Sequence, residues 1–276
     1  MKKDVILTGF PRAGTTLSAT LINILENSVC LSEPDSIVKI IEETTSVEEY
    51  IKKLEEEYDK TREFIIEKGV VINRVPVKGE TLTNYYQRTE GGGIEDVFKV
   101  GDEKVMVKDN GFNLVYKHNA HFLSILPQLL EKERFSVLVV VRNPISVIKS
   151  WRSLHIPISE GRMPAGEKYW PELRTIAESN KDVLTKQVEI YELISKRILT
   201  FKEHVEIVYY EDILKQNSLY EKVFCQKSVT SLPEIKNQNK SEHYNHNETE
   251  TILNKLKEVG DWTFKLYENP EQYFQG

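Results

Sequence analysis

Near its N-terminus the chain reads Val5-Ile6-Leu7-Thr8-Gly9-Phe10-Pro11-Arg12-Ala13-Gly14-Thr15-Thr16-Leu17. A short apolar run, which predicts a buried strand, gives way to a loop containing glycine, proline and arginine, and a helical pattern follows. In a loop of this kind the backbone N–H groups turn toward an anion, and the following helix adds the positive end of its dipole. The stretch therefore predicts a phosphate-binding loop.

This loop differs from the phosphate loop of ATP-binding proteins in the position of its cation. The pattern G-x-x-x-x-G-K-[ST] is nearly matched, with Gly9 and Gly14 in place, but Thr15 stands where the lysine would be. The cation of the loop is instead Arg12. The difference favours a phosphorylated nucleotide other than ATP.

The rest of the chain alternates predicted strands with predicted helices. Strands are expected at residues 4–8, 28–31, 70–73, 104–107, 136–141 and 205–209. Helices are expected at residues 15–26, 47–68, 118–132, 144–151, 181–203 and 248–259. The alternation predicts an α/β protein with three layers, α/β/α, around a central, mostly parallel sheet, similar to that of P-loop NTPases. Ligands of such sheets bind outside the carboxyl ends of the strands.

Length and composition limit the number of domains and the classes of partner that are expected. The 276 residues are expected to form a single domain, residues 1–276, with possible lids at residues 80–103, 153–180 and 232–247, which lack periodicity. A formal net charge of −6 argues against nucleic acid or an anionic membrane surface as partner. The two cysteines lack zinc-site spacing, and no apolar run is long enough to span a membrane. A cytoplasmic protein is therefore expected.

A second predicted anion site follows the most apolar strand, residues 136–141. This strand ends in Arg142, whereas the equivalent strand of a metal-dependent nucleotidase often ends in an aspartate that helps to hold Mg²⁺. Asn143 and Pro144 suit the start of a helix, and Ser150 lies about two turns along it. Arg142 and Ser150 are predicted to hold one phosphate from two sides.

Together, residues 9–16 and the Arg142-Asn143-Pro144 to Ser150 block resemble the two nucleotide-binding signatures of the sulfotransferase family. The run Val208-Tyr209-Tyr210-Glu211-Asp212-Ile213 is similar to a strand-to-helix element of bacterial and carbohydrate sulfotransferases. Members of this family transfer a sulfuryl group from 3′-phosphoadenosine 5′-phosphosulfate (PAPS) and release 3′-phosphoadenosine 5′-phosphate (PAP). Because a sulfuryl group carries less charge than a γ-phosphoryl group, side-chain cations and backbone donors can suffice without a metal.

The resemblance implies roles for the residues that match these signatures. The 5′-phosphosulfate is expected to lie on Pro11, Arg12, Ala13, Gly14, Thr15 and Thr16. Arg142 and Ser150 are expected to hold the 3′-phosphate, and Lys236 and Lys240 to close over it.

The acceptor hydroxyl must lose its proton, so a base within hydrogen-bonding reach is required. Glu33 follows the second predicted strand and resembles the glutamate base of carbohydrate-type members, although a plain loop carboxylate is the alternative. Partial burial beside the donor anion is expected to raise the pKa of Glu33.

Cytosolic members instead use a histidine two positions after a lysine on a middle strand. Lys108 is the nearest match, but Asn110 stands in the place of the histidine. Lys108 is interpreted as an electrostatic partner of the reacting centre, with a solvated lysine as the alternative. The histidines His118, His121 and His155 are interpreted as ordinary surface or packed residues. Four aromatic residues could line an acceptor pocket, although core positions are the more common alternative: Trp151, Trp170, Tyr85 and Tyr86.

The sequence thus predicts a PAPS-dependent, metal-independent sulfotransferase with Glu33 as base and Arg12 at the reacting group. The acceptor is expected to be a hydroxyl or amine of a small molecule, sugar or natural product. A P-loop kinase using ATP and Mg²⁺ is the first alternative, and a PAP- or PAPS-binding protein without turnover is the second. Oligomeric state cannot be read from these residues.

Overall fold

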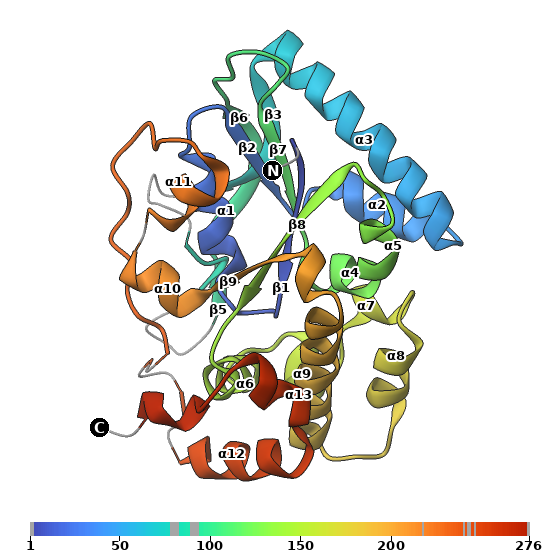
Figure 1. Cartoon of the computed structure of the whole chain (residues 1–276), viewed down its shortest axis with the longest axis vertical. Helices are drawn as coiled ribbons and strands as arrows, with labels where there is room; N and C mark the ends of the chain where they lie inside the picture. Colours follow the sequence, from blue (N-terminus) through green and yellow to red (C-terminus); the bar gives the residue numbers. More distant parts are fainter. Residues whose placement is uncertain are drawn as a thin grey trace.

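The computed structural model describes residues 3–77, 83–88, 94–216, 218–239, 241, 244–245 and 247–274. At its centre lies a five-stranded sheet in the order β2-β7-β1-β8-β9, in which every pair of neighbours is parallel. Figure 1 shows this sheet running through the middle of the molecule. Its strands are β1 (Asp4–Gly9), β2 (Ser28–Ser32), β7 (Asn113–Lys117), β8 (Phe135–Val141) and β9 (Glu206–Tyr209).

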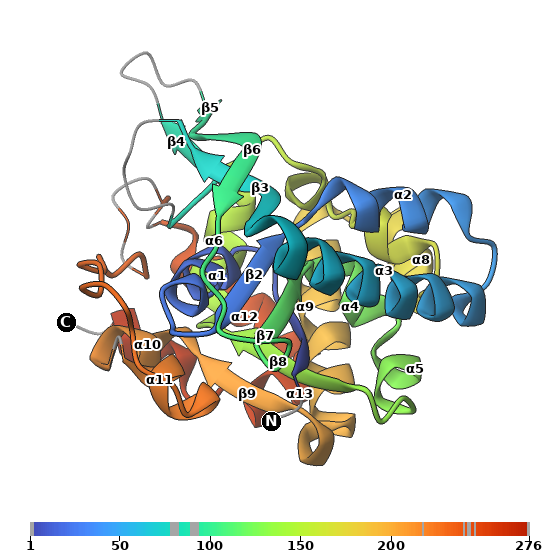
Figure 2. The same cartoon turned by 90° about the horizontal axis from the view of Figure 1, so that it is seen from above.

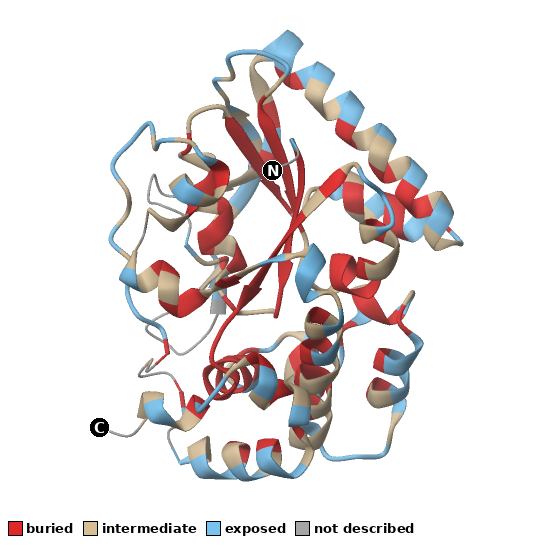
Figure 3. Ribbon diagram, viewed as in Figure 1, coloured by how far each residue is buried: buried red, intermediate tan, exposed pale blue. Residues whose placement is uncertain are grey.

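The neighbouring strands β1 and β8 form the most deeply buried part of the sheet. Every residue of β1 is buried, and β8 is buried apart from Ser136. The two strands pair from Asp4 with Phe135 to Gly9 with Val140. Figure 3 shows the buried residues concentrated along these central strands. Because β1 and β8 end side by side, the phosphate loop and Arg142 start from the same edge of the sheet.

Helices cover both faces of the sheet, which confirms the predicted three-layer α/β architecture. Helix α1 (Thr15–Asn23) packs on one face, and α3 (Val47–Lys68), α4 (Asn119–Ser124) and α5 (Leu126–Leu130) lie toward the other (Figures 1 and 2). The remaining α-helices are α2 (Asp35–Glu43), α6 (Pro144–Arg152), α7 (Pro164–Glu167), α8 (Pro171–Glu178), α9 (Val183–Thr200), α10 (Tyr210–Lys215), α11 (Leu219–Phe224), α12 (Glu248–Val259) and α13 (Asp261–Leu266).

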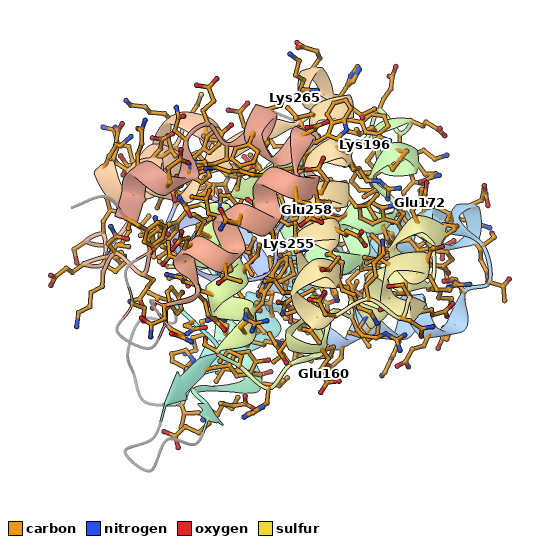
Figure 4. The ribbon with its side chains drawn as sticks, turned by 90° about the horizontal axis from the view of Figure 1, so that it is seen from below. Glu160, Glu172, Lys196, Lys255, Glu258 and Lys265 are labelled. Atoms are coloured by element: carbon orange, nitrogen blue, oxygen red, sulfur yellow. The ribbon has the colours of Figure 1, made fainter. Side chains whose placement is uncertain are left out.

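The C-terminal helices pack against α9, and α12 also contacts α6, which begins just after β8 ends. Both α12 and α13 contact α9, and Figure 4 shows the three helices together. Lys255 and Glu258, labelled on α12, form an ion pair of 2.7 Å between Nζ and Oε2. The described residues also contain three short 3-10 helices: Pro157–Glu160, Lys202–His204 and Pro270–Phe274.

Two predicted strands do not belong to the parallel sheet. The strand expected at residues 70–73 is present as β3 (Val70–Pro76), but it pairs antiparallel with β6 (Phe98–Lys104) in a separate two-stranded ribbon. The strand expected at residues 104–107 is wrong, because β6 ends at Lys104. A second ribbon joins β4 (Tyr86–Arg88) to β5 (Ile94–Asp96).

Within the parallel sheet, the strand that sequence reasoning missed is β7, whose five residues are all buried. Only three apolar residues lie between its polar ends, Asn113 and Lys117, and this run is too short to give a clear strand pattern. The helix expected at residues 118–132 is divided, since α4 ends at Ser124 and Pro127 lies in the first turn of α5.

The three segments predicted as possible lids differ in their secondary structure. Residues 153–180 contain a 3-10 helix, α7 and α8, each with proline in its first turn, and do not form an irregular loop. Part of the segment 80–103 lies outside the described residues, and the remainder carries β4, β5 and the start of β6. The described residues of 232–247 contain no helix or strand.

Candidate active site

A cleft of about 730 Å³ opens beyond the carboxyl ends of the central strands. The wall is formed by the phosphate loop, the ends of β2 and β7, Arg142 before α6, the last turn of α6 and the segment 83–86. Residues predicted to bind the donor and residues predicted to act on the acceptor therefore share one cavity. Its lining includes Arg12, Thr15, Thr16, Glu33, Arg142 and Ser150.

The phosphate loop takes its shape from backbone angles that favour glycine. Gly9 has φ 144°, and a Cβ atom there would collide with the carbonyl oxygen of Val140. Gly14 has φ 99°, and a Cβ atom would meet the Tyr210 ring at 2.8 Å. Arg12 also has a positive φ, of 70°, which is costly for a residue with a side chain and is typical of functional loops.

The start of α1 offers backbone donors to the cleft. Gly14 is the N-cap residue and no side chain caps the helix. The first backbone N–H that bonds within the helix is that of Ser18, which reaches the Gly14 carbonyl at 2.9 Å. The preceding N–H groups, at Thr15 and Thr16 among others, are the donors that a helix leaves without internal partners. Together with the helix dipole they suit an anion.

Pro11 and Ala13 of the loop differ in their exposure to the cleft. Pro11 lines the cleft, and its carbonyl accepts a hydrogen bond of 2.7 Å from the indole N–H of Trp151. Ala13 is fully buried and its side chain belongs to the core, so its contribution is limited to the backbone of the loop.

Arg142 lies beside the phosphate loop, as its position after β8 predicted. The side chain is 4% exposed and its Nη1 donates to the Arg12 carbonyl at 2.9 Å. Its Nε donates to Asn239 Oδ1 at 2.7 Å, and its Nη2 to the Tyr244 hydroxyl at 3.3 Å. Three of the five guanidinium N–H groups are used in this way, which leaves two for a ligand.

Ser150 completes the same corner of the cleft. Its hydroxyl oxygen accepts a hydrogen bond of 3.3 Å from Nε of Arg12. The structure therefore brings Arg12, Arg142 and Ser150 into one connected group, which combines two guanidinium groups with a hydroxyl. Such a group is suited to a phosphate or sulfate.

The element Tyr210-Glu211-Asp212 supports Arg142 from behind. The guanidinium carbon lies 4.6 Å from the centre of the Tyr210 ring. Glu211 Oε1 accepts hydrogen bonds from the backbone N–H of Asn143, at 3.1 Å, and from Asn239 Nδ2, at 2.8 Å. Sequence reasoning missed Asn239 because its neighbours in the chain form a loop without a motif.

Glu33 reaches the cleft from a turn just after β2. Its φ of 51° lies in the left-handed region, and its backbone N–H bonds to the Lys117 carbonyl at 2.8 Å. The carboxylate pairs with two cations, Oε1 with Lys117 Nζ at 2.5 Å and Oε2 with Arg74 Nη1 at 2.8 Å. Lys117 is 2% exposed, so its charge is strongly felt.

The expected rise in the pKa of Glu33 is wrong for this arrangement. Burial acts to raise the pKa, but the charges of Lys117, His118 and Arg74 together outweigh burial and lower the pKa to about 2. Glu33 is therefore an ionised carboxylate at neutral pH. The sequence-based expectation failed because both pairing cations come from distant parts of the chain.

The prediction that Lys108 lies at the reacting centre is also wrong. Lys108 is exposed, forms an ion pair with Glu26, and does not line the cleft. The lysine that ends a middle strand is instead Lys117, at the end of β7. Two residues further on stands Asn119, which lines the cleft, and not a histidine.

The other candidates divide between the cleft and the core. Tyr85 and Tyr86 line the cleft, whereas Trp151 and Trp170 are buried in the core. Lys236 lines the cleft with an exposed side chain, and Lys240 lies outside the described residues. The segment 83–86 touches the phosphate loop through Asn84, whose Oδ1 accepts a hydrogen bond of 2.8 Å from Arg12 Nη1.

His118 and His121 are packed residues, as expected, and they make the fold sensitive to acid. Burial lowers the pKa of His118 to about 4, although the neighbouring Glu33 carboxylate acts to raise it, and burial lowers the pKa of His121 to about 3. An unfolded histidine binds its proton near pH 6.5, so below that pH the unfolded state holds more protons. The stability of the fold is therefore expected to fall from pH 6.5 down to about pH 3.

Urea unfolding at several pH values checks this expectation. Each neutral buried histidine adds a slope of up to about 1.4 kcal/mol per pH unit. The variant His121→Gln is expected to show a shallower loss of unfolding free energy between pH 6.5 and 4.5 than the unaltered protein. The exposed His155, changed to glutamine, serves as the control. Equal slopes for all three proteins would contradict the expectation.

Within the described ranges, no group of three or more histidine, cysteine, aspartate or glutamate residues is placed to hold a metal ion. Each helix of the same ranges is too short or too polar to form a transmembrane span.

A parallel sheet with a strand-end loop and a strand-end arginine in one cleft is an arrangement typical of nucleotide-binding α/β proteins. A family model for the sulfotransferase domain matches residues 2–274. The chain belongs to the sulfotransferase family, so the enzyme class indicated by its motifs is confirmed. Among solved structures it is similar to retinol dehydratase in complex with androsterone and the inactive cofactor PAP. That match has 14% identity and a TM-score of 0.32, and it covers 99% of this chain and 69% of the other. No curated protein matches the chain significantly.

Proposed function

We propose that this protein transfers the sulfuryl group of PAPS to a hydroxyl or amine of a small-molecule, sugar or natural-product acceptor. The observation that carries the proposal is the single cleft in which the phosphate loop meets Arg142 and Ser150. PAPS has two anionic ends, a 5′-phosphosulfate and a 3′-phosphate. A cleft with two groups of anion donors suits such a ligand, and its volume lies in the usual range for ligand sites.

The residues at the cleft fit this ligand. Backbone N–H groups at the start of α1 and the Arg12 guanidinium would hold the 5′-phosphosulfate. Arg142, with two N–H groups left over, and Ser150 would hold the 3′-phosphate, with Lys236 nearby on the rim. When bound, PAPS supplies the sulfuryl group that the acceptor receives. No metal has a part in the proposal.

Glu33 is proposed as the base that takes the proton of the acceptor. Its carboxylate lines the cleft and is ionised at neutral pH, so it is ready to accept a hydrogen bond from a hydroxyl. A pKa near 2 makes it a weak base for a free alcohol. The alcohol oxygen becomes strongly acidic as it bonds to sulfur, however, so even a weak base can take the proton at that stage.

The kinase alternative lacks support in the same residues. A kinase of the P-loop class needs a lysine where Thr15 stands and a carboxylate near Mg²⁺ where the strand ends in Arg142. In the structure Arg142 occupies this place with its charge directed at the loop carbonyl of Arg12. The positive charge of Arg142 at this place would repel Mg²⁺.

Thermal unfolding with added nucleotide tests the proposed donor. PAP at about a hundred times its dissociation constant is expected to stabilise the protein by about 2.7 kcal/mol, a rise in Tm of about 5 °C for a chain of this length. ATP with Mg²⁺ at equal concentration is expected to give a much smaller rise. Adenosine 5′-phosphate is the control for the adenosine part. Stabilisation by ATP with Mg²⁺ and not by PAP would refute the proposal.

A further inference from the structure

A buried amide side chain joins the β3–β6 ribbon to the edge strand β2. Asn73 of β3 is 5% exposed, and its Oδ1 accepts a hydrogen bond of 3.0 Å from the backbone N–H of Ser32. Its Nδ2 donates to the Cys30 carbonyl at 3.0 Å and to Glu103 Oε2, on β6, at 2.7 Å. Because β2 is an edge strand, its outer N–H and C=O groups need partners. The Asn73 amide is the acceptor for the Ser32 N–H and shares the Cys30 carbonyl with Asn23 Nδ2, which donates to it at 2.9 Å.

The residue after Asn73 reaches Glu33. Arg74 pairs with Glu33 Oε2, and its guanidinium carbon lies 4.8 Å from the ring centres of both Tyr85 and Phe98. Such contacts restrict a long side chain that would otherwise sample many rotamers. The hydroxyl of Tyr85 also bonds to Ser32 Oγ, next to Glu33 in the chain. Figures 1 and 2 both show β3 and β6 beside β2.

We propose that Asn73 and Arg74 are positioning residues for Glu33, with the ribbon serving to orient the carboxylate at the cleft. The inference rests on the proposed function, in which Glu33 is the base. Lys117 holds Oε1 from inside the sheet, and Arg74 holds Oε2 from outside it. With both oxygens held, the carboxylate plane cannot turn freely, and one lone pair of each oxygen stays available.

The charged and titratable groups around Glu33 come from three elements. Lys117 and His118 stand at the end of β7, Arg74 comes from β3, and Tyr85 comes from the segment 83–86. Lys117 and Arg74 are the cations at neutral pH, since the pKa of His118 is lowered to about 4, first by burial. Removing Arg74 should therefore leave Lys117 to hold a carboxylate that burial favours in its neutral form.

The test follows the pKa of Glu33 directly by carbon-13 NMR of the glutamate carboxyl groups, with the Glu33 signal identified by its loss in Glu33→Gln. The variant Arg74→Met is expected to raise the pKa of Glu33 by about 1 to 3 pH units. Arg74→Lys should restore part of the difference. Lys99→Met removes a positive charge from an exposed position on the same ribbon and is expected to leave the pKa unchanged. An unchanged Glu33 pKa in Arg74→Met would overturn the proposal.

Asn73→Ala tests the attachment of the β3–β6 ribbon to β2 and leaves the charges of Arg74 and Lys117 in place. It is expected to speed hydrogen exchange of the Ser32 backbone amide by about tenfold or more, because that N–H loses its acceptor. Slow exchange at Ser32 in this variant would show that the ribbon is held by other contacts and would remove Asn73 from the proposal.

Kinetics separate this inference from the proposed function. Arg74→Met is expected to lower kcat by about 10- to 100-fold, with the KM for PAPS nearly unchanged, since orientation and not donor binding is lost. If Arg74→Met raises the Glu33 pKa while Glu33→Gln transfers sulfuryl groups at the full rate, the positioning is real but Glu33 is not the base. If Glu33→Gln is inactive and Arg74→Met changes neither the pKa of Glu33 nor kcat, Glu33 is supported as the base and the positioning role of Arg74 is refuted.

Discussion

Glu33→Gln is expected to lower the rate of sulfuryl transfer by about a hundredfold to ten-thousandfold while PAP binding is retained. Glutamine keeps the size of the side chain, but its amide cannot take a proton from the acceptor. The donor groups at Arg12, Arg142 and Ser150 are not altered, so the Tm rise on adding PAP should stay close to that of the unaltered protein. The measurement is the release of PAP from PAPS in the presence of a panel of small alcohols, phenols and sugars.

A matched control is available within the same cleft. Glu234 also lines it, but its side chain is exposed, and Glu234→Gln is expected to keep nearly full activity. Glu33→Gln also leaves Lys117 buried without its carboxylate partner, so some loss of stability is expected and unfolding must be followed in parallel. A folded Glu33→Gln variant with undiminished turnover would show that another group takes the proton.

Arg142→Ala is expected to abolish the preference for a 3′-phosphate. The affinity for PAP should fall by about a hundredfold or more, because a buried guanidinium that is hydrogen-bonded to an anion contributes several kcal/mol. The affinity for adenosine 5′-phosphate, which lacks the 3′-phosphate, should change far less. The quantity to measure is the ratio of the two dissociation constants by calorimetry, before and after the substitution.

A second substitution guards against simple disruption of the loop. Arg142 also holds the carbonyl of Arg12, so alanine at this position disturbs its surroundings. Arg142→Lys keeps the charge but loses the two-pronged geometry, and it should retain part of the preference. Ser150→Ala is expected to weaken PAP by a smaller factor, about tenfold. A ratio unchanged in both arginine variants would remove Arg142 from the 3′-phosphate site.

Much of the cleft wall around the phosphate loop could be predicted, because its geometry depends on residues that are close together in the sequence. The loop from Gly9 to Gly14 needs particular backbone angles and close approaches, and these select glycine at fixed spacing. Arg142 follows directly on a strongly apolar strand, so its place at the sheet edge comes from chain connectivity. These short blocks were sufficient to indicate the sulfotransferase family and the parallel α/β fold.

Other parts of the cleft and its supports could not be predicted in the same way. β7 has only three apolar residues in its centre, so the lysine of the middle strand was assigned to position 108 and not to position 117. Asn239 and Asn73 act through single amide groups that carry no motif. Their roles depend on which backbone groups lie opposite them after folding.

The protonation state of Glu33 shows the same division most clearly. Its position after β2 could be inferred from the order of residues, since a turn that follows a parallel strand reaches the carboxyl edge of the sheet. Its pKa could not, because the cations that pair with it lie 41 residues away, at Arg74, and 84 residues away, at Lys117. Local pattern is enough where a function depends on backbone conformation and neighbouring residues. Where it depends on charge and hydrogen bonding across space, the packing of distant segments sets the outcome, since electrostatic energy follows distance in the fold and not separation along the chain.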